Sequence, residues 1–289
     1  MRFLRYTAII SAAMCLMTAA SCDHKSSSSQ AAATAGGEET TAAAVQTDAA
    51  EATTEKSQDE AAEDIYQSIK DAQVSNDKPD TGTAGDLITP GEDDEEAKLG
   101  DYRVCEDGIK IYYDESEYPQ ELVLTLKEYF KSFAACSYTD YTKCVYPSYL
   151  EKMDAYLQKE YGYDLRKSFA KQCAGLESKS GGKYTISRVK IEPHGKSAAE
   201  EAATMETEEG VVAQPVTEND PVKNIENFFG NYTDALGSDY YENLKKETDK
   251  IYDMDFYIMM KTEDGSEKLL VGDYEIIFAE KDGRFYTFG

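Results

Sequence analysis

The distribution of hydrophobic residues divides the chain into a polar first third and a patterned remainder. Apart from an apolar run near the start, residues 1–100 are dominated by Ala, Thr, Ser and Glu. Residues 101–289 hold 29 of the 32 aromatic residues, and their apolar positions recur at regular intervals. A stretch of 189 residues is long enough to bury one core. The pattern therefore predicts a single folded domain over 101–289.

Apolar residues at helical spacing predict a long helix early in this domain. Pro119 suits its first turn, where the missing N–H of proline needs no partner. The helix should run to about Cys136, with one apolar face made by five residues: Leu122, Leu126, Tyr129, Phe130 and Phe133. A helical turn at 139–145 should follow and stop before Pro147.

Two further helices are predicted after this turn. Ser148 and Glu151 have the spacing of a capping box, and Gly162 can end the helix that they open. Asp164 then suits the cap of a second helix, with Gly175 as its expected end. We therefore expect the first half of the domain to be helical.

Three segments lie between these helices and the C-terminal region. Residues 181–192 have the β-branched content of a strand. Residues 194–221 contain no aromatic residue and seven acidic residues against one basic residue, which predicts a mobile acidic insertion. Residues 221–236 return to helical spacing, with Val222, Ile225, Phe229, Tyr232 and Leu236 on one side.

The C-terminal region has the alternating pattern of an antiparallel meander. Strands are predicted at 251–261, 268–280 and 285–288, separated by turns at Asp264-Gly265 and Asp282-Gly283. Helices that come first and antiparallel strands that come last favour an α+β fold over a βαβ arrangement.

The long first helix and the two long strands should face each other through large side chains. These residues either fill the space between the elements or, where tyrosines contribute hydroxyls, line a pocket. We expect a filled space. The candidate pocket-lining residues are Tyr129, Phe133, Tyr252, Phe256, Ile258, Tyr274, Ile276 and Phe278.

Both ends of the domain resemble a known superfamily. The segments are LTLKEYFKSFAACSYTDYTKCVYPSYLEKM at 124–153 and GDYEIIFAEKDGRFYTF at 272–288. They are similar to the opening and closing segments of nuclear transport factor two-like (SnoaL-like, cystatin-like) domains, although Phe285 stands where the superfamily usually has Trp. The resemblance implies helices packed on a curved antiparallel sheet, which together form a cone with an apolar pocket.

The resemblance leaves the activity open, because such domains include isomerases, dehydratases and non-catalytic binding or dimerisation modules. The histidines His24 and His194 lie outside the predicted core, which argues against histidine-dependent catalysis. No nucleotide-binding or metal-binding motif occurs, and we assign no catalytic residue, cofactor or metal. We expect a non-catalytic binding or interaction module with an unknown protein or small-molecule partner, and the resemblance also allows a dimer. The alternative is a small-molecule enzyme of the isomerase or dehydratase type.

The start of the chain has the layout of a secretory signal. Arg2 and Arg5 precede an apolar run over 6–18, which is too short to span a membrane. The residues AASC at 19–22 resemble the lipobox of bacterial lipoproteins, with Ala where Leu is preferred. The resemblance implies that 1–21 is a signal peptide and that Cys22 carries a diacylglyceryl group, which anchors the protein to the outside of the cell membrane. The alternative is an ordinary cleaved signal followed by an incidental cysteine.

Residues 22–100 are predicted to be a disordered acidic linker. Residues 23–100 hold 19 acidic against 5 basic residues, and Tyr66 is their one aromatic residue. Within them, AAEDIYQSIKDAQ at 61–73 has helical spacing, which indicates either a transient helix or a partner-binding segment. The whole chain has a formal net charge of −26, so nucleic acid and anionic lipid headgroups should be repelled. This charge favours solubility, and the alternative is capture of cationic ligands.

The domain contains Cys105, Cys136, Cys144 and Cys173, whose spacing is not that of a zinc site. Export would permit disulfides, and Cys136 and Cys144 flank one turn and could meet. Cys136 and Cys173, however, fall on apolar helix faces, where a free cysteine packs as a small hydrophobic residue. This placement favours free thiols.

Overall fold

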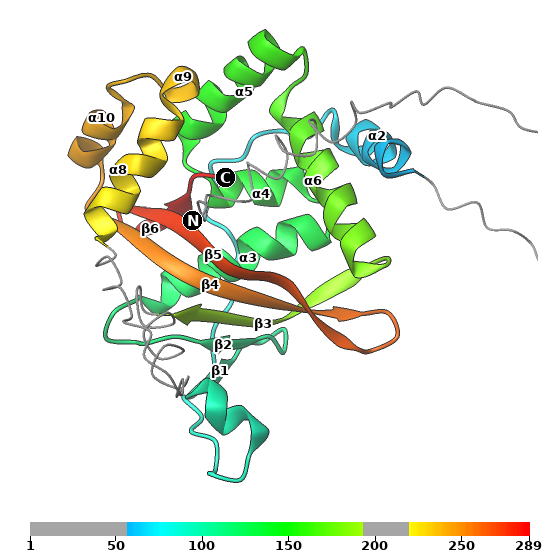
Figure 1. Ribbon diagram of the computed structural model, residues 1–289, viewed down its shortest axis with the longest axis vertical. Helices are drawn as coiled ribbons and strands as arrows, with labels where there is room; N and C mark the ends of the chain where they lie inside the picture. The colour runs from blue at the N-terminus through cyan, green and yellow to red at the C-terminus, as the bar shows by residue number, and fades with distance from the viewer. Residues whose placement is uncertain (1–56, 193–219) are drawn as a thin grey trace, which may run out of the picture.

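One twisted sheet organises residues 57–192 and 220–289, which are the residues described by the computed structural model (Figure 1). In this part of the chain the sheet has six strands in the order β1-β2-β3-β4-β5-β6. The strands are β1 (Arg103–Val104), β2 (Lys110–Tyr112), β3 (Tyr184–Glu192), β4 (Lys250–Thr262), β5 (Glu267–Lys281) and β6 (Arg284–Thr287).

The helices fall into three groups along the chain. The first is α2 (Gln58–Ile69), with the short 3₁₀ helix η1 (Glu95–Leu99) after it. The second group is α3 (Gln120–Ala134), α4 (Tyr138–Cys144), α5 (Pro147–Tyr161) and α6 (Leu165–Ser180). The third group is α8 (Pro221–Asn231), α9 (Thr233–Leu236) and α10 (Tyr240–Glu247). The predicted mixed α+β composition is confirmed.

Helices α3, α4 and α6 pack against one face of the sheet, and α8 contacts β4 at one end (Figure 1). Strands β2 and β3 are parallel, because the helices α3 to α6 are inserted between them, whereas the other neighbouring strands are antiparallel. The chain thus forms α3 to α6 before β3, and α8 to α10 come between β3 and the β4-β5-β6 meander.

The predicted meander is confirmed in its strands and in its turns. Tyr252 pairs with Phe278, and Phe256 pairs with Tyr274, so the apolar residues of β4 and β5 share one face as expected. The second turn places Asp282 at φ +53° and Gly283 at φ +70°. Two consecutive residues with positive φ make the tight turn that matches the twist of the flanking strands.

The predicted start of α5 is wrong, although the helix itself is present. Tyr146 occupies the N-cap position and Pro147 the first helical position, and no side chain caps the helix. The predicted Ser148–Glu151 capping box therefore does not form. Ser148 lies one residue inside the helix, where its hydroxyl is 3.1 Å from the Tyr240 hydroxyl.

The predicted end of α6 is also wrong. Asp164 caps the helix as expected, by accepting a hydrogen bond from the Lys167 N–H, but the helix passes Gly175 and ends at Ser180, with Gly181 as its C-cap. A Cβ atom at Gly175 would lie 3.2 Å from the Gln58 side chain of α2. Gly175 thus provides room for α2 against α6.

The predicted helix at 221–236 is divided in two. It breaks at Tyr232 between α8 and α9, and Val222, expected on the apolar face, is 59% exposed. Ile225, Phe229 and Leu236 are buried as predicted. Helix α10 was not predicted.

The N-terminal segment differs most from the sequence prediction, because it is folded from Ser57 onward. Ser57 and Glu60 form a capping box at the start of α2, and Ala62 and Ile69 are buried. The predicted disordered linker is therefore wrong for residues 57–100, where the helical spacing noted at 61–73 becomes a docked helix. The predicted signal peptide, Cys22 and nearly all of the insertion at 194–221 lie outside the described residues.

Candidate functional site

The predicted pocket residues belong to the hydrophobic core, with Tyr274 packed against it. Tyr129, Phe133, Phe256, Ile258 and Phe278 are at most 1% exposed; Tyr252 and Ile276 are also buried, and Tyr274 is half-buried. Their rings pack on other core rings: Phe256 lies 5.3 Å from Phe130, and Phe133 lies 5.0 Å from Phe169 of α6 between ring centroids. The surroundings of these side chains are thus other apolar side chains.

A second arrangement, which the sequence did not reveal, is an extended segment that we call the belt, residues 72–88. The belt leaves α2 and crosses α6 and α4, whose side chains bind its main chain. Arg166 Nε donates to the Ala72 carbonyl at 3.0 Å, and the Ser75 N–H donates to Thr142 Oγ1 at 2.9 Å. These contacts recognise the backbone of the belt, whatever its side chains.

The belt then passes the C-terminal strand and joins the edge of the sheet. The Arg284 guanidinium of β6 donates to the carbonyls of Asn76 and Asp77, at 2.9 and 2.8 Å. Farther along, Ile88 and Tyr102 exchange two backbone hydrogen bonds, of 2.8 and 3.0 Å. The belt is therefore attached to the domain along its whole length.

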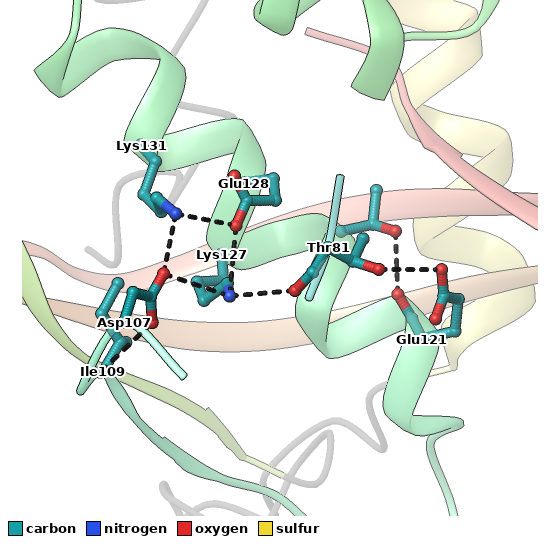
Figure 2. Close-up of polar contacts among 8 residues, drawn as sticks. Thr81, Asp107, Ile109, Glu121, Lys127, Glu128 and Lys131 are labelled. Atoms are coloured by element: carbon teal, nitrogen blue, oxygen red, sulfur yellow. Dashed lines mark hydrogen bonds and ion pairs between the residues drawn. The ribbon is translucent and has the colours of Figure 1, made fainter. Parts of the chain in front are cut away.

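The most concentrated group of charges in the belt region is a clamp on α3 (Figure 2). Lys127 is 2% exposed, and its ammonium lies 3.1 Å from the Thr81 carbonyl, 3.3 Å from Asp107 Oδ2 and 3.1 Å from Glu128 Oε1. Lys131 lies 2.7 Å and 3.0 Å from the same two carboxylate oxygens. Two ammonium groups and two carboxylates thus alternate around a ring that holds the belt at Thr81.

The clamp is suited to holding a chain segment. An ammonium has three N–H donors, and those of Lys127 face three acceptors, so none is left to act on a substrate. Burial alone would raise the pKa of Asp107, but the hydrogen bond from Lys131 and the charge of Lys127 outweigh it and hold that pKa below its ordinary value. Burial likewise raises the pKa of the neighbouring Cys105 thiol, which disfavours the nucleophilic thiolate.

The sequence of α3 contains one indication of the clamp. Leu122 to Leu126 form an uninterrupted run that includes Thr125, and all five residues are buried. A helix buried on nearly every side can accommodate the next residue, Lys127, only with partners for its charge. The identity of those partners is not readable from the helix, because Asp107 and Thr81 come from segments 20 and 46 residues earlier in the chain.

Comparison of this chain with protein-family models, curated proteins and solved structures found no match. Among the described residues, no helix combines the length and apolar character required to cross a bilayer. Within the same residues, no three His, Cys, Asp or Glu side chains are grouped so that they could hold a metal ion.

Proposed function

We propose that this protein is an extracytoplasmic lipoprotein, anchored by a lipid on Cys22, whose α+β domain serves as a non-catalytic binding or interaction module. The observation that carries the proposal is the belt. A tethered domain needs a firm junction between its core and the chain that leads to the membrane. The belt and α2 form such a junction, since side chains of α3, α4, α6 and β6 bind the chain on the membrane-proximal side of the domain.

The belt also defines the length of the proposed tether. With residues 57–100 folded on the domain, the tether comprises residues 23–56 rather than the 78 residues up to Gly100. Fewer residues therefore separate the proposed anchor from the folded domain than the sequence alone suggested.

We place the domain in the nuclear transport factor two-like superfamily as part of this proposal. Register shifts occur in the β3–β4 pairing between Ile186 and Arg188, and in the β4–β5 pairing between Phe256 and Ile258, where β5 carries the extra residue. Such bulges bend a strand and increase its twist, which is what a curved sheet around α3 requires. They support the cone-shaped arrangement and leave the ligand or partner open.

Membrane fractionation tests the anchor. Full-length protein carrying Cys22→Ala should be exported but recovered in the soluble extracytoplasmic fraction, because it lacks the acceptor thiol for the lipid. Cys15→Ala is the matched control, since it removes a cysteine from the same N-terminal segment and should leave the protein with the membrane. Membrane retention of exported Cys22→Ala protein would reject the lipid anchor.

A second candidate function, a small-molecule enzyme or binder of the same fold, is favoured by one observation. The hydroxyls of Tyr129 and Tyr149 are buried without a hydrogen-bond partner among the described residues. Two such groups would be satisfied by a polar ligand within the helical layer. Asp253, a buried carboxylate, does not join them, because it accepts a hydrogen bond from the Asn224 side chain of α8 at 3.3 Å. A stoichiometric small molecule released from the purified protein in native mass spectrometry would favour this function, and ligand-free protein would favour the first.

A further inference from the structure

The thiols of Cys136 and Cys173 meet where α3 ends against α6. The Cys136 side chain lies beside that of Cys173 where α3 contacts α6, although 36 residues separate the two in the chain. Cys173 is fully buried, and Cys136 is half-buried and packs on the same core. The sequence suggested Cys144 as the neighbour of Cys136, but the structure places Cys173 there.

The backbone at Cys136 adds an independent observation. Helix α3 ends with hydrogen bonds from the Cys136 N–H to the Phe133 carbonyl and from the Ser137 N–H to the Ser132 carbonyl. These two bonds define a Schellman motif, whose left-handed position is usually occupied by glycine. Cys136 takes that position with φ +50°. Position 136 thus has a cysteine where the left-handed backbone favours glycine, and the thiol of this cysteine lies beside that of Cys173.

The two thiols differ in a way that suits stepwise oxidation. The neighbouring Cys173 thiol lowers the pKa of Cys136, while burial, together with the neighbouring Cys136 thiol, raises the pKa of Cys173. The half-buried thiol is therefore the one that ionises and is reached from solvent. The buried thiol is positioned to act second, as a resolving cysteine does.

We propose that Cys136 and Cys173 form a disulfide that joins the end of α3 to α6. The oxidant is a disulfide compound or a disulfide-carrying oxidoreductase of the extracytoplasmic space. The Cys136 thiolate attacks one sulfur of the oxidant, forms a mixed disulfide and releases one thiolate. Cys173 then loses its proton, attacks the Cys136 sulfur and releases the second thiolate. Two protein thiols lose two electrons and two protons, and the oxidant leaves as two thiols.

Cysteine mapping tests this pairing directly. The purified full chain is incubated with oxidised glutathione, denatured without reductant, alkylated and digested. We expect a cross-linked peptide pair that contains Cys136 and Cys173, while Cys105 and Cys144 are alkylated. Alkylation of both Cys136 and Cys173, a stable glutathione adduct on Cys136 alone, or a Cys136–Cys144 cross-link would each overturn the proposal.

A measurement of thermal stability distinguishes a disulfide between Cys136 and Cys173 from two thiols that only pack against each other. Cys136→Gly keeps the left-handed turn, so under reducing conditions its melting temperature should equal or slightly exceed that of the parent protein. Oxidation should raise the melting temperature of the parent by roughly 5–10 °C and leave that of Cys136→Gly unchanged. Cys144→Ala is the matched control, because it removes a buried cysteine and should retain the rise. A parent protein with equal melting temperatures in both conditions would contradict the bond.

Discussion

The core beneath the sheet and the belt on the helices are held to the domain by opposite means. In the core, rings of α3, α6 and β4 pack on one another with almost no exposure. The belt contributes main-chain groups, which the side chains of Arg166, Lys127 and Arg284 bind. Core residues are therefore held by their own apolar side chains, whereas the backbone of the belt is held by side chains of other elements. For this reason the belt is folded on the domain although it is acidic and has few apolar residues.

Truncation in the core should give the largest effect. Phe256 is fully buried against Phe130, so Phe256→Ala should lower the free energy of unfolding by about 3–5 kcal/mol. Leu269 is 50% exposed on the neighbouring strand, and Leu269→Ala should change that free energy by less than about 0.5 kcal/mol. Urea unfolding measures both. Equal losses for the two variants would mean that the α3–sheet contact is not the main source of stability.

Breaking the clamp should give the next largest effect, mainly in the belt. Lys127→Met keeps the apolar stem but removes the charge, and we expect a loss of about 2 kcal/mol, since Lys131 still pairs with Asp107 and Glu128. Limited proteolysis should then cleave the belt faster while the core resists. Lys143→Met is the control, because its partner Asp140 is 56% exposed and such a pair is worth less than about 1 kcal/mol. An intact belt in Lys127→Met would show that the other belt contacts suffice.

Acid should loosen the belt before the core. The pKa of Asp107 is lower in the folded protein than in the unfolded chain, so its charged form favours folding. This contribution is fully present above the unfolded value of about 4 and is lost as the pH falls through the folded value. Belt amides should therefore exchange faster below about pH 4. Asp107→Asn should show weaker belt protection at neutral pH and a smaller change with acid; an unchanged acid response would exclude Asp107 as its source.

Removing the cap of α2 should have the smallest effect. Ser57 accepts a hydrogen bond from the Glu60 N–H at 3.3 Å, and Ser57→Ala should lower the stability of α2 by about 0.5–1 kcal/mol. Hydrogen exchange should rise in α2 alone, with the urea midpoint of the domain unchanged. Ser116→Ala, another exposed serine, is a suitable comparison. A change in the urea midpoint would mean that α2 and the core unfold together.

The sequence predicted the elements that have their own periodicity. Helix α3, strands β4 and β5 and the Asp282-Gly283 turn were identified because apolar spacing and turn chemistry are local properties. The candidate pocket residues come from these same elements, and their role in lining a pocket stays a prediction. Gly175 was misread as a helix end, because glycine also serves where another helix approaches closely, and only the position of α2 distinguishes the two uses.

The sequence by itself thus determined the α+β class, the shared apolar face of α3, β4 and β5, and the acidic character of the chain. The tertiary structure decided that residues 57–100 fold, that Lys127 binds Thr81 and Asp107, and that Cys136 meets Cys173 rather than Cys144. The physical reason is the distance along the chain over which each interaction acts. Periodicity and turn chemistry act over a few residues, whereas a buried charge, a backbone carbonyl or a thiol finds its partner only after distant segments pack together.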